Sequence, residues 1–132
     1  RGRGGILNVS STAGLQPIPR FSAYAASKSF LLNYSLATNH ELKLRASPVY
    51  ISTLCPPAVR SGFQRASGMD GLRLFADGFG TMDADAVAEI GYRGFVDREA
   101  LIIPRLRVRV AVGFLSWLPR RMAMNLCLHA LQ

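Results

Sequence analysis

The sequence predicts an α/β fold built on a parallel sheet, and three segments carry this prediction. An apolar run at residues 5–9 breaks into a loop of serine and glycine, a helix-favouring run covers residues 22–43, and a second apolar run covers residues 49–54. A strand, a loop, a helix and a strand of these lengths indicate one βαβ unit. We therefore expect a doubly wound parallel sheet to which the chain contributes three strands with their helices.

The helix at residues 22–43 carries apolar residues at a spacing of three and four. Such a stripe is typical of a helix that buries one face, so we expect this set to pack against the sheet. Pro48 marks the turn into the next strand. The residues of the stripe are Ala26, Phe30, Tyr34 and Ala37.

Beyond the second strand, residues 61–80 are rich in glycine and have no clean period, so this stretch is either a lid over a ligand or an ordinary loop. Asp83 and Asp85 then open another helix, because acidic residues in a first turn complement the helix dipole. Residues 100–103 form a short third strand that Pro104 ends.

Tyr24 and Lys28 are the first candidate catalytic residues. They stand four positions apart in the helix, which places both side chains on one face. The ammonium there favours the phenolate and lowers a tyrosine pKa that is about 10 when unperturbed. A shift of two units corresponds to roughly 2.7 kcal/mol, and it brings the tyrosine closer to the range of a general acid–base at neutral pH. Ser11 follows the first strand, where open α/β sheets bind ligands, and offers a hydroxyl to a substrate oxygen.

Three motifs together resemble the short-chain dehydrogenase/reductase family. They are Asn-Val-Ser-Ser-Thr-Ala-Gly at residues 8–14, Tyr-Ala-Ala-Ser-Lys at 24–28 and Cys-Pro-Pro-Ala-Val-Arg-Ser at 55–61. Their order and spacing are those of the family, and the resemblance covers residues 4–104. It implies a Rossmann-type sheet and an oxidoreductase that moves hydride between a nicotinamide cofactor, NAD or NADP, and a carbonyl or alcohol.

The resemblance also implies a role for each matching residue. Tyr24 moves the proton, Ser11 orients the substrate carbonyl, and Lys28 promotes the phenolate and binds the nicotinamide ribose. Family tendency favours NADP over NAD, and the apolar lid favours a lipid-like substrate. The implied cofactor-binding residues are Tyr24, Lys28, Pro56, Pro57, Ala58, Val59 and Ser61. The implied substrate residues are Ser11, Phe63 and Met69.

The chain departs from the family pattern in two places. Pro57 stands where the family has glycine, which permits backbone angles and a close cofactor approach that proline does not. No glycine-rich phosphate-binding turn follows a strand, since the glycines of residues 1–5 precede theirs. We therefore expect residues 1–104 to be the carboxyl-terminal half of a longer enzyme, inactive in isolation, with residues 105–132 as a basic extension.

That extension carries five of the eight net positive charges and no carboxylate. Its uncharged run at residues 110–118, which includes Phe114 and Trp117, is too short to cross a bilayer, which needs about 20 residues. Arginines beside aromatic residues suit a peripheral segment on an anionic membrane. A helix that packs on the enzyme's own body or across a dimer is the alternative.

Other partners and ligands are excluded on composition and spacing. The aromatics do not alternate with the basic residues as base-stacking platforms do, so no nucleic acid is expected despite the charge of +8. Cys55 and Cys127 lack disulfide or metal spacing and indicate reduced thiols of a cytoplasmic protein. His40 and His129 have no histidine, cysteine or carboxylate neighbour at a spacing typical of metal ligands, so no metal is expected.

Three functions remain open at this stage. The first is an oxidoreductase with Tyr24 as acid–base, which the resemblance implies is a homo-oligomer joined through the helix at residues 22–43. The second is a non-catalytic remnant or binding subunit that pairs through an exposed sheet edge. The third is a protein that associates with a membrane surface through its arginine- and tryptophan-containing tail.

Overall fold

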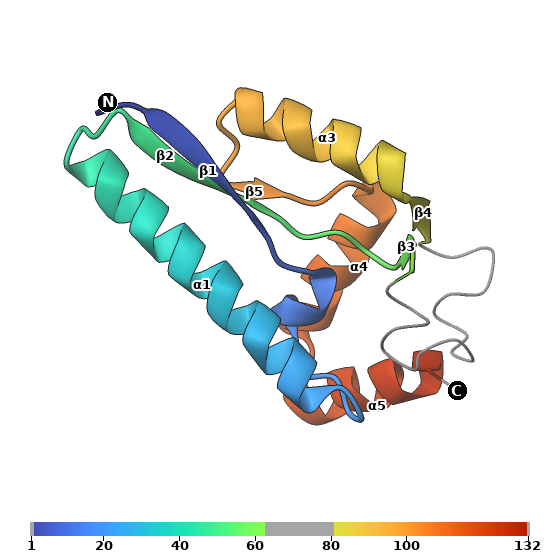
Figure 1. The fold of residues 1–132 in the computed structure, drawn as a ribbon. Helices are drawn as coiled ribbons and strands as arrows, with labels where there is room; N and C mark the ends of the chain where they lie inside the picture. The colour runs from blue at the N-terminus through green and yellow to red at the C-terminus, as the bar shows by residue number, and fades with distance from the viewer. Residues whose placement is uncertain (1, 63–80, 132) are drawn as a thin grey trace.

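The computed structural model describes residues 2–62 and 81–131 of the 132-residue chain (Figure 1). In chain order the elements are β1 (Gly4–Val9), the 3-10 helix η1 (Thr12–Leu15), α1 (Ser22–Leu44), β2 (Val49–Leu54), β3 (Val59–Arg60), β4 (Met82–Asp83), α3 (Ala84–Val96), β5 (Leu101–Ile102), α4 (Leu106–Trp117) and α5 (Arg120–Leu131).

The main sheet has the order β1-β2-β5, and all three strands are parallel. β1 and β2 pair along their whole length, whereas β5 pairs with β2 only at Thr53 and Leu54. This confirms the predicted α/β class with a parallel sheet. A second, two-stranded parallel ladder between β3 and β4 was not predicted, because each of its strands is only two residues long.

The sheet lies between two helices, with α1 on one face and α3 on the other (Figure 1). The apolar core lies between the sheet and α3 and contains the buried side chains Leu54, Val87 and Ile102. Glycines bring α3 close to the sheet, since a Cβ on Gly91 would stand 2.7 Å from Leu54 and one on Gly94 would stand 2.7 Å from Ile102. The helix predicted to begin at Asp83 and Asp85 is observed as α3, which starts at Ala84.

The prediction that an apolar stripe of α1 packs against the sheet is wrong. All four of its residues are exposed, and two of them, Phe30 and Tyr34, stack on each other at the surface with ring centroids 5.9 Å apart. The face that meets the sheet combines two apolar and two polar residues at the same helical spacing. Those buried residues are Ala25, Leu32, Ser35 and Asn39.

Hydrogen bonds explain why this face is buried although it carries two polar residues. Asn8 in β1 donates from Nδ2 to Ser35 Oγ at 2.8 Å. Asn39 Oδ1 accepts the backbone N–H of Ile51 in β2, also at 2.8 Å. Because Ser35 and Asn39 each have a partner, their desolvation is compensated and the aromatic residues are left on the outer face.

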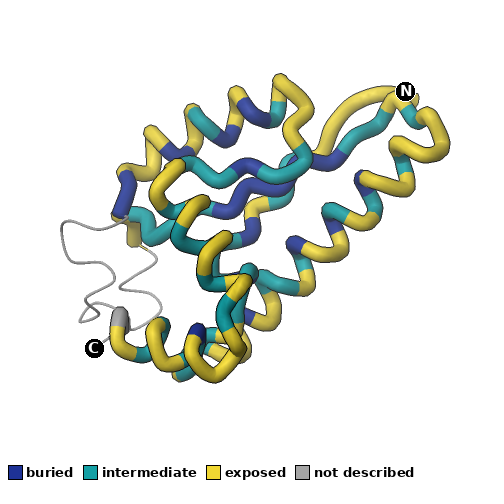
Figure 2. Tube along the Cα trace, turned by 180° about the vertical axis from the view of Figure 1, so that it is seen from behind, coloured by how far each residue is buried: buried dark blue, intermediate teal, exposed yellow. Residues whose placement is uncertain are grey.

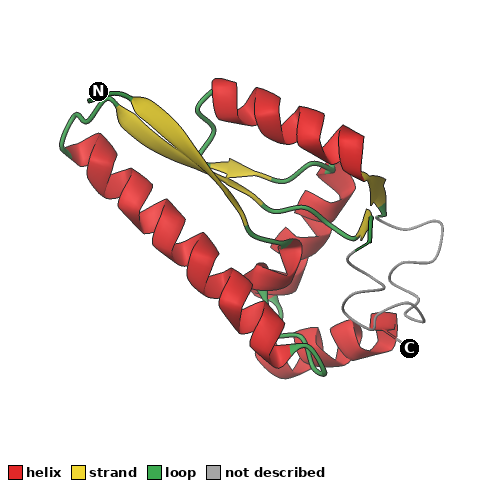
Figure 3. Ribbon diagram, viewed as in Figure 1, coloured by secondary structure: helices red, strands yellow, loops and turns green. Residues whose placement is uncertain are grey.

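The basic extension forms two helices, α4 and α5, of which α5 lies beside the amino-terminal end of α1 (Figure 3). Pro119 separates them, since proline cannot continue the hydrogen-bond ladder of α4. α4 contacts η1, so part of the extension packs on the body of the domain.

Candidate active site

Two adjacent serines follow β1, and they have different surroundings. Ser10 is buried, and its hydroxyl donates to the backbone carbonyl of Lys28 at 2.8 Å. Ser11 is half-buried at the amino end of η1, where its Oγ accepts the N–H of Ala13 at 3.1 Å. A hydroxyl that accepts one bond retains its hydrogen, so Ser11 can still donate to a ligand oxygen at the carboxyl end of β1.

Tyr24 and Lys28 lie on one face of α1, as their spacing predicts. The Nζ of Lys28 lies 5.8 Å from the centroid of the Tyr24 ring and donates to the backbone carbonyl of Val9 at 3.0 Å. Val9 is the last residue of β1 and is two positions from Ser11. The lysine therefore holds the face of α1 that carries Tyr24 next to the carboxyl end of β1, which Ser11 follows. The three predicted residues thus lie at the same end of the sheet.

The loop after β2 is hydrogen-bonded to the loop after β1. The carbonyl of Pro56 accepts from the backbone N–H of Thr12 at 3.0 Å and from the Thr12 hydroxyl at 3.3 Å. The carbonyl of Ala58 accepts the N–H of Met82, which starts the β3–β4 ladder. Sequence reasoning did not single out Thr12, although a hydroxyl residue beside Ser11 was a visible signal.

This bonding pattern also accommodates Pro57, the departure from the family motif. In the hydrogen bonds described above, the loop contributes only the carbonyl oxygens of Pro56 and Ala58 as acceptors. None of these bonds needs a backbone N–H at Pro57. Proline removes a donor and fixes one backbone angle, so it is tolerated where only the carbonyl is used. The second proline therefore leaves the connection between the two loops intact.

Apart from Tyr24 and Lys28 on α1, the residues predicted to bind the cofactor lie in the segment from the end of β2 to just after β3. Four of them are half-buried and Ser61, after β3, is exposed. Phe63 and Met69, predicted to contact substrate, lie outside the described residues, as does most of the predicted lid at 61–80. The four half-buried residues are Pro56, Pro57, Ala58 and Val59.

Cys55 lies beneath these loops. It is fully buried, and burial raises the pKa of its thiol to about 11. Hydrogen bonds from the Ser10 side chain and the Ser11 backbone, together with the charge of Lys28, act in the opposite direction but do not offset the burial. The thiol is therefore neutral at pH 7 and supports the serine loop by packing, not as a nucleophile.

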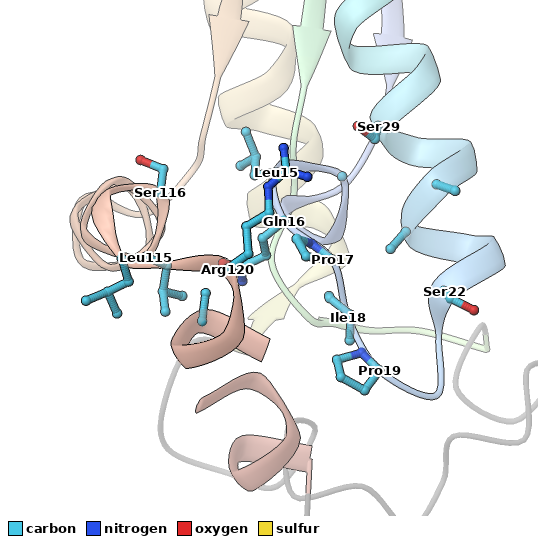
Figure 4. A pocket seen from close by; sticks show the side chains of 15 residues that line it. Leu15, Gln16, Pro17, Ile18, Pro19, Ser22, Ser29, Leu115, Ser116 and Arg120 are labelled. Carbon is cyan, nitrogen blue, oxygen red and sulfur yellow. The ribbon is translucent and has the colours of Figure 1, made fainter. Parts of the chain in front are cut away.

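A separate cavity of about 540 Å³ lies on the other side of α1, between that helix, the loop after η1 and the tail helices (Figure 4). Ser11, Tyr24 and Lys28 do not line it. Gln16 borders it, and the buried Oε1 of Gln16 has no hydrogen-bond partner in the described part of the chain. The other labelled lining residues are Leu15, Pro17, Ile18, Pro19, Ser22, Ser29, Leu115, Ser116 and Arg120.

Residues 2–62 and 81–131 contain no cluster of three or more histidine, cysteine or carboxylate side chains able to hold a metal ion. Both cysteines are free thiols. Of the helices that the structure describes, none combines the length and the apolar character needed to cross a bilayer.

Comparisons with known proteins identify relatives of this chain. The chain is 37% identical over 79 residues to 17-beta-hydroxysteroid dehydrogenase type 3 of Rattus norvegicus, a match that spans 60% of the chain and 25% of that protein. It is 38% identical over 68 residues to inactive hydroxysteroid dehydrogenase-like protein 1 of Danio rerio, spanning 52% of the chain and 20% of the relative.

Among solved structures, the fold is similar to that of a short-chain dehydrogenase from Sphingobium yanoikuyae in complex with NADPH. The TM-score is 0.65 at 27% identity, and the match covers 89% of this chain and 47% of that one. The chain thus spans about half of this structure and a quarter or less of the two curated relatives. The family model for short chain dehydrogenases matches residues 1–70, which is more than half of the 132 residues. This chain therefore belongs to the short-chain dehydrogenase family.

Proposed function

We propose that residues 1–104 form the carboxyl-terminal half of an NAD(P)-dependent oxidoreductase domain and that residues 105–132 are a basic extension of it. The observation that carries the proposal is the position of Lys28. Its Nζ bonds the last carbonyl of β1 and lies 5.8 Å from the ring of Tyr24, so an ammonium, a phenol and the Ser11 hydroxyl share one end of the sheet. Open α/β sheets bind ligands at this end.

Each of the three residues has a distinct task in the proposed reaction. The nicotinamide, when bound, supplies or accepts the hydride at the substrate carbon. In the direction of reduction, the Tyr24 hydroxyl gives its proton to the carbonyl oxygen while the Ser11 hydroxyl donates a hydrogen bond to the same oxygen. The Lys28 ammonium then stabilises the phenolate left on Tyr24.

The chain's residues fit the nicotinamide end of such a cofactor. An ammonium has three donors, and Lys28 uses one of them on Val9, which leaves donors for ribose hydroxyls. The sequence has no Gly-x-x-x-Gly-x-Gly pattern after a strand, so its residues do not fit the cofactor phosphates. We therefore expect no measurable turnover from these 132 residues alone.

We propose NADP(H) as the preferred cofactor and a hydrophobic, lipid-like ketone or alcohol as the substrate. The NADPH complex of the similar Sphingobium enzyme and the hydroxysteroid dehydrogenase from rat support this choice. We also propose a homo-oligomer that joins through the outer face of α1. The exposed, stacked Phe30 and Tyr34 offer the apolar surface for that contact.

The test is activity of the protein expressed from the reading frame extended upstream of residue 1. Oxidation of NADPH and NADH is followed with a panel of hydrophobic ketones. Tyr24→Phe removes the proton donor and is expected to lower kcat/KM by about 10²- to 10⁴-fold. Tyr92→Phe is the matched control, because it removes the same hydroxyl from an exposed position on α3, and it should leave the rate unchanged.

A second matched pair separates Ser11 from its neighbour. Ser11→Ala is expected to lose activity, whereas Ser10→Ala should mainly lose stability, by about 1 kcal/mol, because its hydroxyl bonds only the protein. Full activity in Tyr24→Phe would remove Tyr24 from the acid–base role.

A non-catalytic subunit is the second candidate. Pro57 in place of the family glycine favours it, and so does the similarity to a relative described as inactive. It predicts that the extended protein binds NADPH but turns over no substrate, with Tyr24→Phe indistinguishable from the parent.

A further inference from the structure

Helix α4 is apolar on both sides, but only one side is packed. Its inner residues Val108, Val112 and Leu115 are half-buried, and Leu115 borders the cavity near η1. No residue of α4 is fully buried, whereas α1 and α3 each carry buried positions along their length (Figure 2). An apolar helix side is normally buried against a partner, and in the described structure the outer side of α4 has none.

The exposed apolar residues of that outer side follow one another at intervals of four, four and three positions. At 3.6 residues per turn this spacing forms one continuous stripe along the helix. Trp117 is 91% exposed and Phe114 is 64% exposed, which is far above what large apolar side chains usually show. The members of this outer stripe are Leu106, Val110, Phe114 and Trp117.

Positive charge surrounds the outer stripe. Arg107 and Arg109 fall on its two sides in the helical projection, and three more arginines lie just before α4 and at the start of α5. All five are exposed, and in the described residues none of them pairs with a carboxylate. Residues 105–132 contain no Asp or Glu at all. The other three arginines are Arg105, Arg120 and Arg121.

The exposed apolar residues and the arginines together indicate which kind of partner binds the outer stripe. A second copy of the chain would bring two clusters of unpaired arginines together, which is unfavourable. A nucleic acid would neutralise the arginines but has no apolar phase in which a row of aliphatic and aromatic side chains can be buried. The interface of an anionic lipid bilayer supplies both, since it offers headgroup phosphates beside an apolar layer.

We propose that the outer stripe of α4 and its flanking arginines bind an anionic lipid surface. The helix lies in the plane of the interface, because 12 residues are too few to cross the apolar layer. Its inner side keeps the contact with η1. This inference stands independently of the proposed oxidoreductase activity.

Trp117 makes the test specific, because it is the only tryptophan among the 132 residues. Its fluorescence is recorded while the chain is titrated with phosphatidylcholine vesicles that contain or lack phosphatidylserine. We expect a blue shift with the anionic vesicles, a weak or absent shift with the neutral ones, and reversal by added salt, because the arginine contribution is screened. Co-sedimentation with the same vesicles gives the binding constant.

Variants separate the contribution of the apolar side chains from that of the arginines. Phe114→Ser should weaken vesicle binding about tenfold or more, and Arg107→Gln and Arg109→Gln should weaken it about fivefold each. Tyr92→Ser is the matched control, since Tyr92 on α3 is also helical, aromatic and 64% exposed, and it should bind like the parent.

Three results would overturn the proposal. The first is no shift with anionic vesicles, or a shift that the three variants leave unchanged. The second is an equal shift with duplex DNA in the absence of lipid, which would assign the arginines to nucleic acid. The third is a shift produced by raising the protein concentration alone, which would assign the outer stripe to a second copy of the chain.

Discussion

Replacement of Gly14 by alanine tests the close contact that positions the serine loop. A Cβ at this position would stand 2.7 Å from the backbone carbon of Lys28, 2.8 Å from its oxygen and 2.9 Å from the backbone nitrogen of Ser29. All three atoms belong to the backbone of α1, so no side-chain rotation can relieve the overlap. η1 and α1 must move apart, which also strains the bond between Ser10 and the Lys28 carbonyl.

The expected cost follows from two opposing effects. Overpacking of a well-packed contact costs about 1–3 kcal/mol, and rigid backbone partners place this case at about 3. Alanine recovers about 1 kcal/mol of backbone entropy relative to glycine in a helical conformation. We therefore expect Gly14→Ala to lower the free energy of unfolding by about 2 kcal/mol.

Equilibrium urea unfolding followed by circular dichroism measures this change, with the slope expected to stay constant. Gly113→Ala is the control, because Gly113 lies within α4 and a Cβ there would meet nothing within 4 Å. That variant should be unchanged or up to about 1 kcal/mol more stable. If Gly14→Ala matched Gly113→Ala, the reasoning about the η1–α1 contact would be wrong.

Two further predictions concern buried groups. Burial raises the pKa of the Cys55 thiol from 9.0 to about 11, so the folded state favours the neutral thiol. The stability that this provides is fully present below pH 9 and is lost as the pH rises to 11. The expected loss in the free energy of unfolding is about 3 kcal/mol. Unfolding of the parent and of Cys55→Ala over that range measures it, and parallel pH curves would contradict it. Asn39→Ala leaves the buried N–H of Ile51 without its acceptor and should cost about 1–3 kcal/mol. The exposed Asn33→Ala should change stability by less than about 0.5 kcal/mol, and equal losses in the two variants would refute the assignment.

The elements that the sequence predicted well are those that local patterns define. The helix over residues 22–43 was observed as Ser22–Leu44, and the strand over residues 49–54 was observed as Val49–Leu54. Helical geometry alone places Tyr24 and Lys28 on one face, since side chains four positions apart share a side of any α-helix. This part of the site needs no tertiary information.

Which side of α1 meets the sheet was predicted wrongly, and the reason is physical. The spacing of Phe30 and Tyr34 is equally compatible with a buried or an exposed face, because hydrophobic periodicity assumes that apolar residues are the ones buried. The choice is made by Ser35 and Asn39, whose hydrogen bonds reach β1 and β2. Residues with such partners cannot be told from surface residues in one sequence.

By itself, the sequence determined the fold class, the main helices and strands, the family resemblance and the residue types of the candidate site. Only the tertiary structure decided how those residues meet. It buries Ser10 and leaves Ser11 accessible, it connects Lys28 to Val9 across 19 positions, and it joins Thr12 to Pro56 across 44. It also packs one side of α4 and exposes the other. Such contacts depend on where separate segments dock, and docking is settled by the shape and polarity of both partners, which no local pattern contains.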